Sequence, residues 1–112
     1  VSLPTPRGVR RVDVRSALQM QAAVQAEVAQ ADVLVATAAV ADWRPTHASD
    51  EKIKKDGSGK TPQLHFTENP DILAGVAASE RAQAGQLFCV GFAAESHDLL
   101  SNAQSKRQRK GV

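Results

Sequence analysis

In the stretch D-V-L-V-A-T-A, residues 32–38, one acidic residue is followed by a continuous run of small, apolar and β-branched residues. Runs of this composition are typical of strands that are covered on both faces, as the strands of parallel sheets are. The sequence therefore predicts a central strand at 32–38.

A strand and a helix are expected before this run. Residues 9–14 alternate apolar and polar side chains, which predicts a short strand with one covered face. Ser16 and Gln19 have the spacing of a capping box, so a helix should start there and continue to about Gln30. Its apolar face should hold Met20, Val24 and Val28. Strand, helix and strand in this order form a βαβ unit with a right-handed crossover.

The chain after residue 38 continues the alternation of strands and helices. Periodicity is broken from 39 to 61, residues 63–67 predict a short strand, and Asn69-Pro70-Asp71 predicts a helix start with Asn69 as N-cap. A strand at 86–92 and a helix from about 98 to Gly111 follow. The order predicts an α/β fold, a Rossmann-like three-layer open sheet, mostly parallel, with helices on both faces.

Composition sets limits on the class of protein. The chain has 112 residues with 42% hydrophobic and 23% charged residues, as ordinary globular domains do, and its net charge is only +2. That charge is too small to argue for a nucleic-acid partner. No run approaches the ~20 apolar residues of a membrane span, and no signal peptide is visible. The single Cys89 excludes an internal disulfide. We therefore expect a cytoplasmic location. Because it starts at Val1 and ends just after a basic helix, we expect a fragment of a longer protein.

Ligands of open α/β sheets bind beyond the carboxyl ends of the strands. Residues 37–39, 68–71 and 91–95 leave such ends, and small residues in two of them would let a flat ligand approach the backbone. Ala and Gly also occur at strand ends simply to turn the chain. The helix start at 69–71 could accept a phosphate or a carbonyl oxygen, but Asn-Pro-Asp is also a common cap without any ligand, and on sequence grounds this plainer interpretation comes first.

The segment 43–61 is expected to be a flexible lid. It carries K-I-K-K at 52–55, where a lysine could close over a triphosphate, although surface lysine runs are usually only solvated. Asp42 could accept hydrogen bonds from a sugar or a base, or could simply cap a turn. Lys106 and Lys110 share a helix face, yet cations in a last helical turn are favoured by the helix dipole alone.

Two other motifs do not indicate a site. Residues 57–61, G-S-G-K-T, resemble the end of a phosphate-binding P-loop, but Lys54 stands where that motif needs Gly and Pro62 disfavours the helix that should follow. His47, His65 and His97 are far apart in the sequence and lack partner ligands, so no zinc site is predicted.

Five motifs occur in an order that resembles a known family. They are A-A-V-A-D-W-R (38–44), K-I-K-K (52–55), N-P-D-I-L (69–73), G-F-A-A-E (91–95) and K-R-Q-R-K (106–110). Together they resemble bacterial phosphopantothenoylcysteine synthetase, the ligase domain of the bifunctional coenzyme A biosynthesis flavoprotein. The resemblance covers essentially the whole chain, so residues 1–112 are expected to be part of a single CTP-binding ligase domain that lacks its N-terminal and C-terminal portions.

The resemblance implies a reaction and a set of contacts. The family joins 4′-phosphopantothenate to L-cysteine through an acyl-cytidylate, with release of CMP and pyrophosphate, and Mg²⁺ is expected with the CTP. FMN is expected only in a decarboxylase domain upstream, and a homodimer is expected. Lys52 would act in catalysis as well as in binding. The other implied nucleotide contacts are Ala36, Thr37, Ala38, Asp42, Pro70, Asp71, Ile72, Leu73, Phe92, Lys106 and Lys110, and no metal ligand is implied.

The sequence departs from the family pattern in places, and other functions remain open. A Gly-rich turn and an Asn-bearing stretch before the first strand are absent, so this piece alone could be inactive. Gln19 replaces a usual Glu, and Ser49-Asp50 replaces a usual Pro. One alternative is a non-catalytic Rossmann-like module that binds a dinucleotide, although no G-x-G-x-x-G is present. Another is a nucleic-acid-binding domain, which would need more net charge and interleaved aromatic residues.

Overall fold

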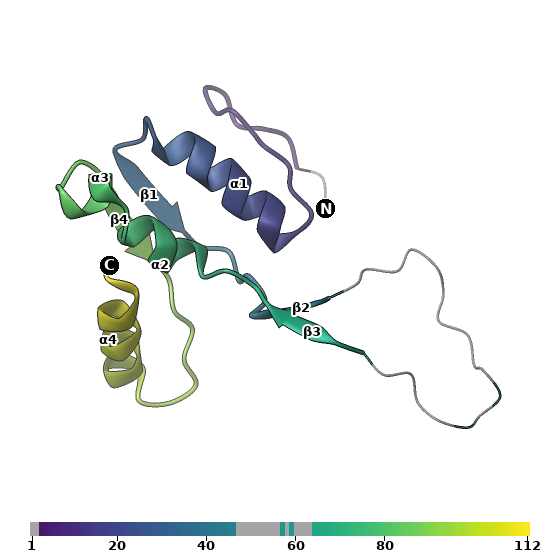
Figure 1. Ribbon diagram of the computed structural model, residues 1–112. Coiled ribbons are helices and arrows are strands. Elements are labelled where there is room, and N and C mark those ends of the chain that lie inside the picture. The colour runs from purple at the N-terminus through teal and green to yellow at the C-terminus, as the bar shows by residue number, and fades with distance from the viewer. Residues whose placement is uncertain (1–2, 47–56, 58, 60–63) are drawn as a thin grey trace.

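The computed structural model describes residues 3–46, 57, 59 and 64–112. Figure 1 shows helices gathered around a short parallel sheet, with a two-stranded arm extending away from it. In chain order the elements are α1 (Ala17–Val28), β1 (Val33–Ala36), β2 (Trp43–Pro45), β3 (Phe66–Glu68), α2 (Ile72–Ala77), α3 (Glu80–Gln83), β4 (Phe88–Gly91) and α4 (Leu99–Lys110).

The predicted central strand is confirmed as β1, and it pairs in parallel with β4. The register places Val33 opposite Phe88 and Ala36 opposite Gly91. The pairing extends beyond the last residue of β4, because Phe92 N donates to Ala36 O at 3.3 Å. Parallel strands joined through helices confirm the α/β class, and the arrangement is that of a partial Rossmann-like domain.

The two faces of this sheet differ in their surroundings. Successive side chains of a strand point to opposite faces, so Val33 lies on one face with its partner Phe88, and Leu34 lies on the other. The face with Val33 and Phe88 is open, since these side chains are 54% and 69% exposed. Leu34, on the opposite face, lines the same pocket as Met20 of α1.

Helix α2 lies at the centre of the packing. It contacts α1, α3, β4 and α4. Two of the buried core side chains, Val76 and Ala77, belong to it, and Leu87, just before β4, is the third in the described part of the chain. A Cβ placed on Gly111, where α4 ends, would lie 3.9 Å from Ala77 Cβ, so the two helices approach each other there. The short helix α2 therefore holds the sheet and the last helix together.

The predicted start of α1 is confirmed in detail. Ser16 is the N-cap, and its Oγ accepts a hydrogen bond from Gln19 N at 3.1 Å. Gln19 Oε1 accepts from Arg15 N at 2.8 Å, one residue earlier than in a standard capping box. The end of the last helix is also confirmed, because Gly111 closes α4 in the left-handed conformation that favours glycine.

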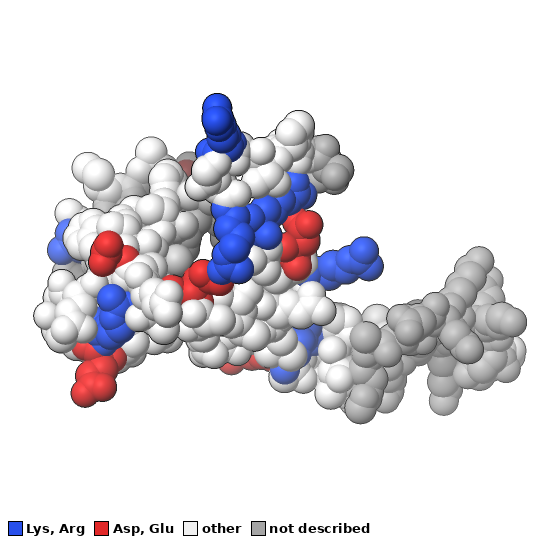
Figure 2. Space-filling view, turned by 90° about the horizontal axis from the view of Figure 1, so that it is seen from above, with Lys and Arg blue, Asp and Glu red and all other residues white. Residues whose placement is uncertain are grey.

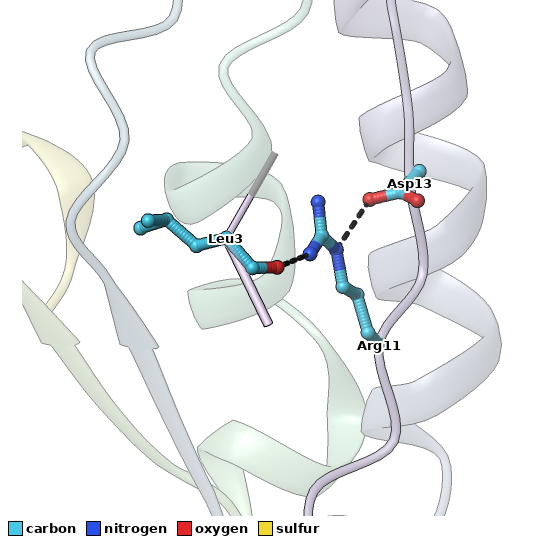
Figure 3. Close-up of polar contacts among 3 residues, drawn as sticks. All are labelled: Leu3, Arg11 and Asp13. Atoms are coloured by element: carbon cyan, nitrogen blue, oxygen red, sulfur yellow. Dashed lines mark hydrogen bonds and ion pairs between the residues drawn. The ribbon is translucent and has the colours of Figure 1, made fainter. Parts of the chain in front are cut away.

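The strand predicted at 9–14 was wrong. These residues form no strand in the structure, although their alternation was real. The guanidinium of Arg11 instead donates to Leu3 O and, through Nε, to Asp13 Oδ1 at 2.7 Å (Figure 3). Arg10 forms an ion pair with Glu27 of α1. None of the described strands lies beside this segment, so its backbone has no ladder of hydrogen bonds to join. The side chains of Arg10 and Arg11 hold it in place instead.

The broken periodicity after residue 38 concealed a strand. Residues 43–45, placed in the predicted lid, form β2, which pairs antiparallel with β3 through Trp43 opposite Glu68. The strand predicted at 63–67 is confirmed in part and shifted, since β3 covers Phe66–Glu68. The remainder of the predicted lid, including K-I-K-K at 52–55, lies outside the described residues apart from Gly57 and Gly59.

The helix predicted from Asn69 starts later and is divided. Its N-cap is Asp71, whose Oδ1 accepts from Ala74 N at 3.1 Å, because the Asn69 side chain is used elsewhere. Helix α2 ends at Ala77, and Ser79 caps the separate helix α3. With six residues, α2 is too short to supply the helix dipole that the anion-binding interpretation required.

Substituting Ser16 with Ala should lower the free energy of unfolding by about 1 kcal/mol, because the cap of α1 is lost. Thermal unfolding followed by circular dichroism measures the change. Ser101→Ala is the matched control, since Ser101 lies inside exposed α4, where Ala is the better helix former. Equal losses of stability from the two substitutions would contradict the capping role.

Candidate ligand-binding site

A pocket of about 390 Å³ lies where β1 and β4 end, at the edge of the sheet at which open α/β folds bind ligands. Its size is in the usual range for small-molecule sites. Segments far apart in the sequence form it: α1, the chain following β1, the connection from β3 to α2, the residue after β4, and the end of α4. The lining residues are Met20, Val24, Leu34, Val35, Ala36, Thr37, Ala38, Val40, Ala41, Asp42, Glu68, Asn69, Pro70, Asp71, Ile72, Leu73, Phe92 and Lys110.

One part of the pocket is apolar. Met20 and Val24 reach it from α1, Leu73 from α2, and Phe92 from the end of β4. Phe92 is 70% exposed, so its ring is free to cover a ligand. Side chains of this kind accept a flat ring, since aromatic and thioether groups pack well against π systems.

A close approach of backbone and side chain shapes this apolar part. A Cβ placed on Gly91 would lie 2.6 Å from Leu73 Cδ2, which is closer than real contacts allow. A side chain at this position would therefore displace the tip of Leu73, which also lines the pocket. Glycine at 91 lets Leu73 lie directly against the end of β4.

Asn69 connects the pocket wall to the arm. Its Nδ2 donates to Ala41 O at 2.8 Å, and its backbone N donates to Asp42 O at 2.7 Å. Its Oδ1 accepts from Arg44 Nη1 at 3.1 Å, and the same Arg44 nitrogen donates to Glu68 O at 3.0 Å. One amide side chain thus fixes the chain after β1 against the chain after β3.

The charged group that enters the pocket is Lys110. Its Nζ lies 2.5 Å from Asp71 Oδ2, and both residues line the cavity. Partial burial acts to raise the pKa of Asp71, but the hydrogen bonds from Lys110 and from Ala74 N, with the charges of Lys110 and Arg109, outweigh it. The pKa of Asp71 is therefore below its usual 3.8. This stabilisation is present above the ordinary pKa and is lost as the pH falls through the lowered one.

Lys106 points to a different partner. It forms an ion pair with Glu95, whose side chain is largely buried, and it does not line the pocket. The two ion pairs, Lys106–Glu95 and Lys110–Asp71, connect α4 to the chain after β4 and to the start of α2. Lys106 therefore helps to position the helix that carries Lys110.

The structure brings most of the predicted contact residues into this one pocket, while their contact with a ligand stays a prediction. Lys106 is outside the pocket, and Lys52 lies outside the described residues. Met20 and Val24 line the pocket, although the sequence placed them only on the apolar face of a helix. Asn69 also lines it; the sequence placed this residue at a strand end where ligands could bind, with a cap as the first interpretation. The predicted residues that line the pocket are Ala36, Thr37, Ala38, Asp42, Pro70, Asp71, Ile72, Leu73, Phe92 and Lys110.

Other parts of the described chain offer fewer features of a site. Within residues 3–46 and 64–112, no group of three or more His, Cys, Asp or Glu side chains is arranged to hold a metal ion. Burial raises the pKa of the Cys89 thiol, which lowers its reactivity. On the face seen in Figure 2, Lys and Arg side chains lie among Asp and Glu side chains, and they do not form an uninterrupted basic patch.

The fold and the pocket define an α/β domain with a cavity of small-molecule size at the carboxyl end of a parallel sheet. Comparison with known families shows to which family of α/β domains the chain belongs. The chain belongs to the family described as the DNA/pantothenate metabolism flavoprotein C-terminal domain, whose model matches residues 1–112.

Named relatives agree with the family. The chain is 45% identical over 112 residues to the coenzyme A biosynthesis bifunctional protein CoaBC of Vibrio cholerae, and 46% identical over 113 residues to that of Escherichia coli. Both matches cover 100% of the chain. The corresponding protein of Mycobacterium bovis is 46% identical over 118 residues, a match that covers 97% of the chain. In each case the chain spans only 27% of the relative's length.

These comparisons correct the narrower identification made from the sequence. The family description names a flavoprotein and mentions no synthetase, ligase or CTP, and the relatives' name gives two functions without assigning either to the matched part. The assignment as a CTP-dependent phosphopantothenate–cysteine ligase, with CTP and Mg²⁺ as its nucleotide and metal, is therefore replaced by membership of the flavoprotein family. The physical reason is that motifs at strand ends specify a fold and a pocket, which different activities can share.

In the part of the chain that the structure describes, no helix is both long enough and apolar enough to span a membrane.

Gly91→Ala should lower the free energy of unfolding by about 1–3 kcal/mol, because the added methyl displaces Leu73 from the end of β4. Gly75→Ala is the matched control. Nothing lies within 4 Å of a Cβ at Gly75, inside α2, so that substitution should stabilise the protein by about 0.5–1 kcal/mol. Denaturant titration measures both values. Stabilisation by Gly91→Ala would contradict the close packing.

Asn69→Ala should destabilise the protein by about 1–3 kcal/mol, because Ala41 O and the Arg44 guanidinium lose a partner. The emission of Trp43, the single tryptophan, should change as well, since Trp43 lies on the arm that Asn69 holds. Asn102→Ala removes a hydrogen bond from Asn102 Nδ2 to His97 O in another part of the molecule. If both variants left Trp43 emission unchanged, the connecting role of Asn69 would be wrong.

Proposed function

We propose that this chain is the ligand-binding part of an enzyme of coenzyme A biosynthesis, and that its pocket takes a mononucleotide, a ligand with one flat ring and a phosphate. The pathway is suggested by the names of the relatives, of whose length the chain spans about a quarter. The observation that carries the ligand class is the pocket itself, in which an apolar part with Phe92 faces the same cavity as the cation Lys110.

Physical chemistry supports this pairing of ring and phosphate. A ring placed among Met20, Val24 and Phe92 removes apolar surface from water, which is favourable at roughly 25 cal/mol per Å². Small residues from Ala36 to Ala38 leave space at the backbone. A phosphate beside Lys110 gains a charge-assisted hydrogen bond, which is stronger than a neutral one.

A flavin is the first ring to test, because the family is named for a flavoprotein. Flavin mononucleotide has the required ring and phosphate, and the apolar residues present are compatible with its ring. The sequence resemblance placed FMN in a separate upstream domain, and direct measurement of FMN binding to this pocket tests that expectation.

Other expectations about partners stay as proposals. They are 4′-phosphopantothenate and L-cysteine as small-molecule partners, a homodimer, and a catalytic Lys52. A cytoplasmic location is proposed on the basis of the free thiol of Cys89, which suits a reducing compartment.

The test is a comparison of ligands on the complete natural polypeptide that contains this chain. Flavin mononucleotide, NADPH, and purine and pyrimidine nucleoside triphosphates are measured by calorimetry, each beside its unphosphorylated counterpart where one exists. We expect one mononucleotide to bind and its unphosphorylated counterpart to bind at least about tenfold more weakly, as a lost charge-assisted hydrogen bond implies. Phe92→Ala should weaken that binding further.

Two results would overturn the proposal. Tighter binding of NADPH than of every mononucleotide would favour the dinucleotide module. Equal binding of phosphorylated and unphosphorylated forms would show that the pocket has no phosphate site. Phe88→Ala is the matched control for Phe92→Ala, because Phe88 is similarly exposed but does not line the pocket.

A further inference from the structure

We propose that Asp71 is an internal substitute for the ligand's anion, so that an anionic ligand binds by taking Lys110 away from Asp71. This inference rests on the proposed function, since it concerns how the same pocket selects a phosphorylated ligand. It makes Asp71 a specificity-determining residue that acts through Lys110.

The first observation is geometric. Lys110 Nζ and Asp71 Oδ2 are 2.5 Å apart, and both side chains line the pocket. Neither is fully enclosed, because the Lys110 side chain is 27% exposed and that of Asp71 is 49% exposed. The cation therefore already has an anionic partner at the place where a ligand phosphate would need it.

The second observation is that Asp71 has a second partner, while Lys110 is held by a single carboxylate. Asp71 Oδ1 accepts from Ala74 N and caps α2, so Asp71 keeps its position when Lys110 leaves. The lysine side chain is long and flexible, and partly exposed ion pairs of this type contribute little to stability. A phosphate with several acceptor oxygens can therefore compete for Lys110, whereas a neutral ligand has nothing to offer it.

A third observation concerns the charges around the pair. Arg109 acts on Asp71 from the neighbouring position of α4, and its charge also lowers the pKa of Asp71. After Lys110 has moved to a ligand, Asp71 thus retains the Ala74 hydrogen bond and a nearby positive charge. The carboxylate stays ionised and pocket-facing, where it repels ligands whose anion does not engage Lys110.

The experiment separates Asp71 from Lys110 with an anion that lacks a ring. Binding of inorganic pyrophosphate to the complete natural polypeptide is measured by calorimetry at low ionic strength. Lys110→Gln should weaken pyrophosphate binding about tenfold or more, because a charge-assisted contact is lost. Asp71→Asn should strengthen it about threefold or more, because Lys110 is freed. Asn is also a good N-cap, so α2 keeps its start.

Matched controls keep the result interpretable. Arg107→Gln removes one positive charge from the same helix at a residue that neither lines the pocket nor contributes to the lowered pKa of Asp71, so it should weaken pyrophosphate binding much less than Lys110→Gln does. Asp71→Ser, which also caps helices, is the second variant if Asp71→Asn unfolds. In the Lys110→Gln background, Asp71→Asn should have a smaller effect than in the parent chain.

Several outcomes would overturn the inference. If Asp71→Asn weakened pyrophosphate binding as Lys110→Gln does, Asp71 would be a direct ligand contact. If no variant bound pyrophosphate, or if Lys110→Gln had no effect, Lys110 would not be an anion acceptor. Either result leaves the proposed function to be judged separately, since binding of a mononucleotide ring is measured with Phe92→Ala.

Discussion

The packing of α2 against the end of β4 is the contact on which the rest of the structure depends. Gly91 has no side chain, so Leu73 can lie directly over the strand end. In the same helix Val76 and Ala77 are buried, and α2 contacts both α1 and α4. The pocket is the space left beside this contact, and its walls are the segments that α2 brings together.

The ion pair between Asp71 and Lys110 is a second constraint on the positions of α2 and α4. Asp71 starts α2 with one carboxylate oxygen and holds Lys110 with the other. The end of α4 is thereby fixed to the beginning of α2, and a cation is kept at the pocket. A single side chain contributes to folding and to the charge of the site, so the two are not independent.

The elements that short-range rules govern were predictable from the sequence. The run at 32–38 became β1 because β-branched and small apolar residues suit a covered strand. Ser16 and Gly111 marked the start of α1 and the end of α4 because capping depends on a few neighbouring backbone groups. The gathering of the strand-end residues at one pocket also followed, since the carboxyl ends of parallel strands meet at one edge.

Features that depend on distant partners became visible only in the folded chain. Residues 9–14 have no neighbouring strand among those described, whereas Trp43–Pro45 pairs with β3. The cap of α2 is Asp71 and not Asn69, because the Asn69 amide forms hydrogen bonds with Ala41 and Arg44. Local periodicity carries no information about such pairings. The different ion-pair partners of Lys106 and Lys110 also depend on the fold. Their i, i+4 spacing places both on one helix face, but it does not predict which carboxylate each lysine will pair with.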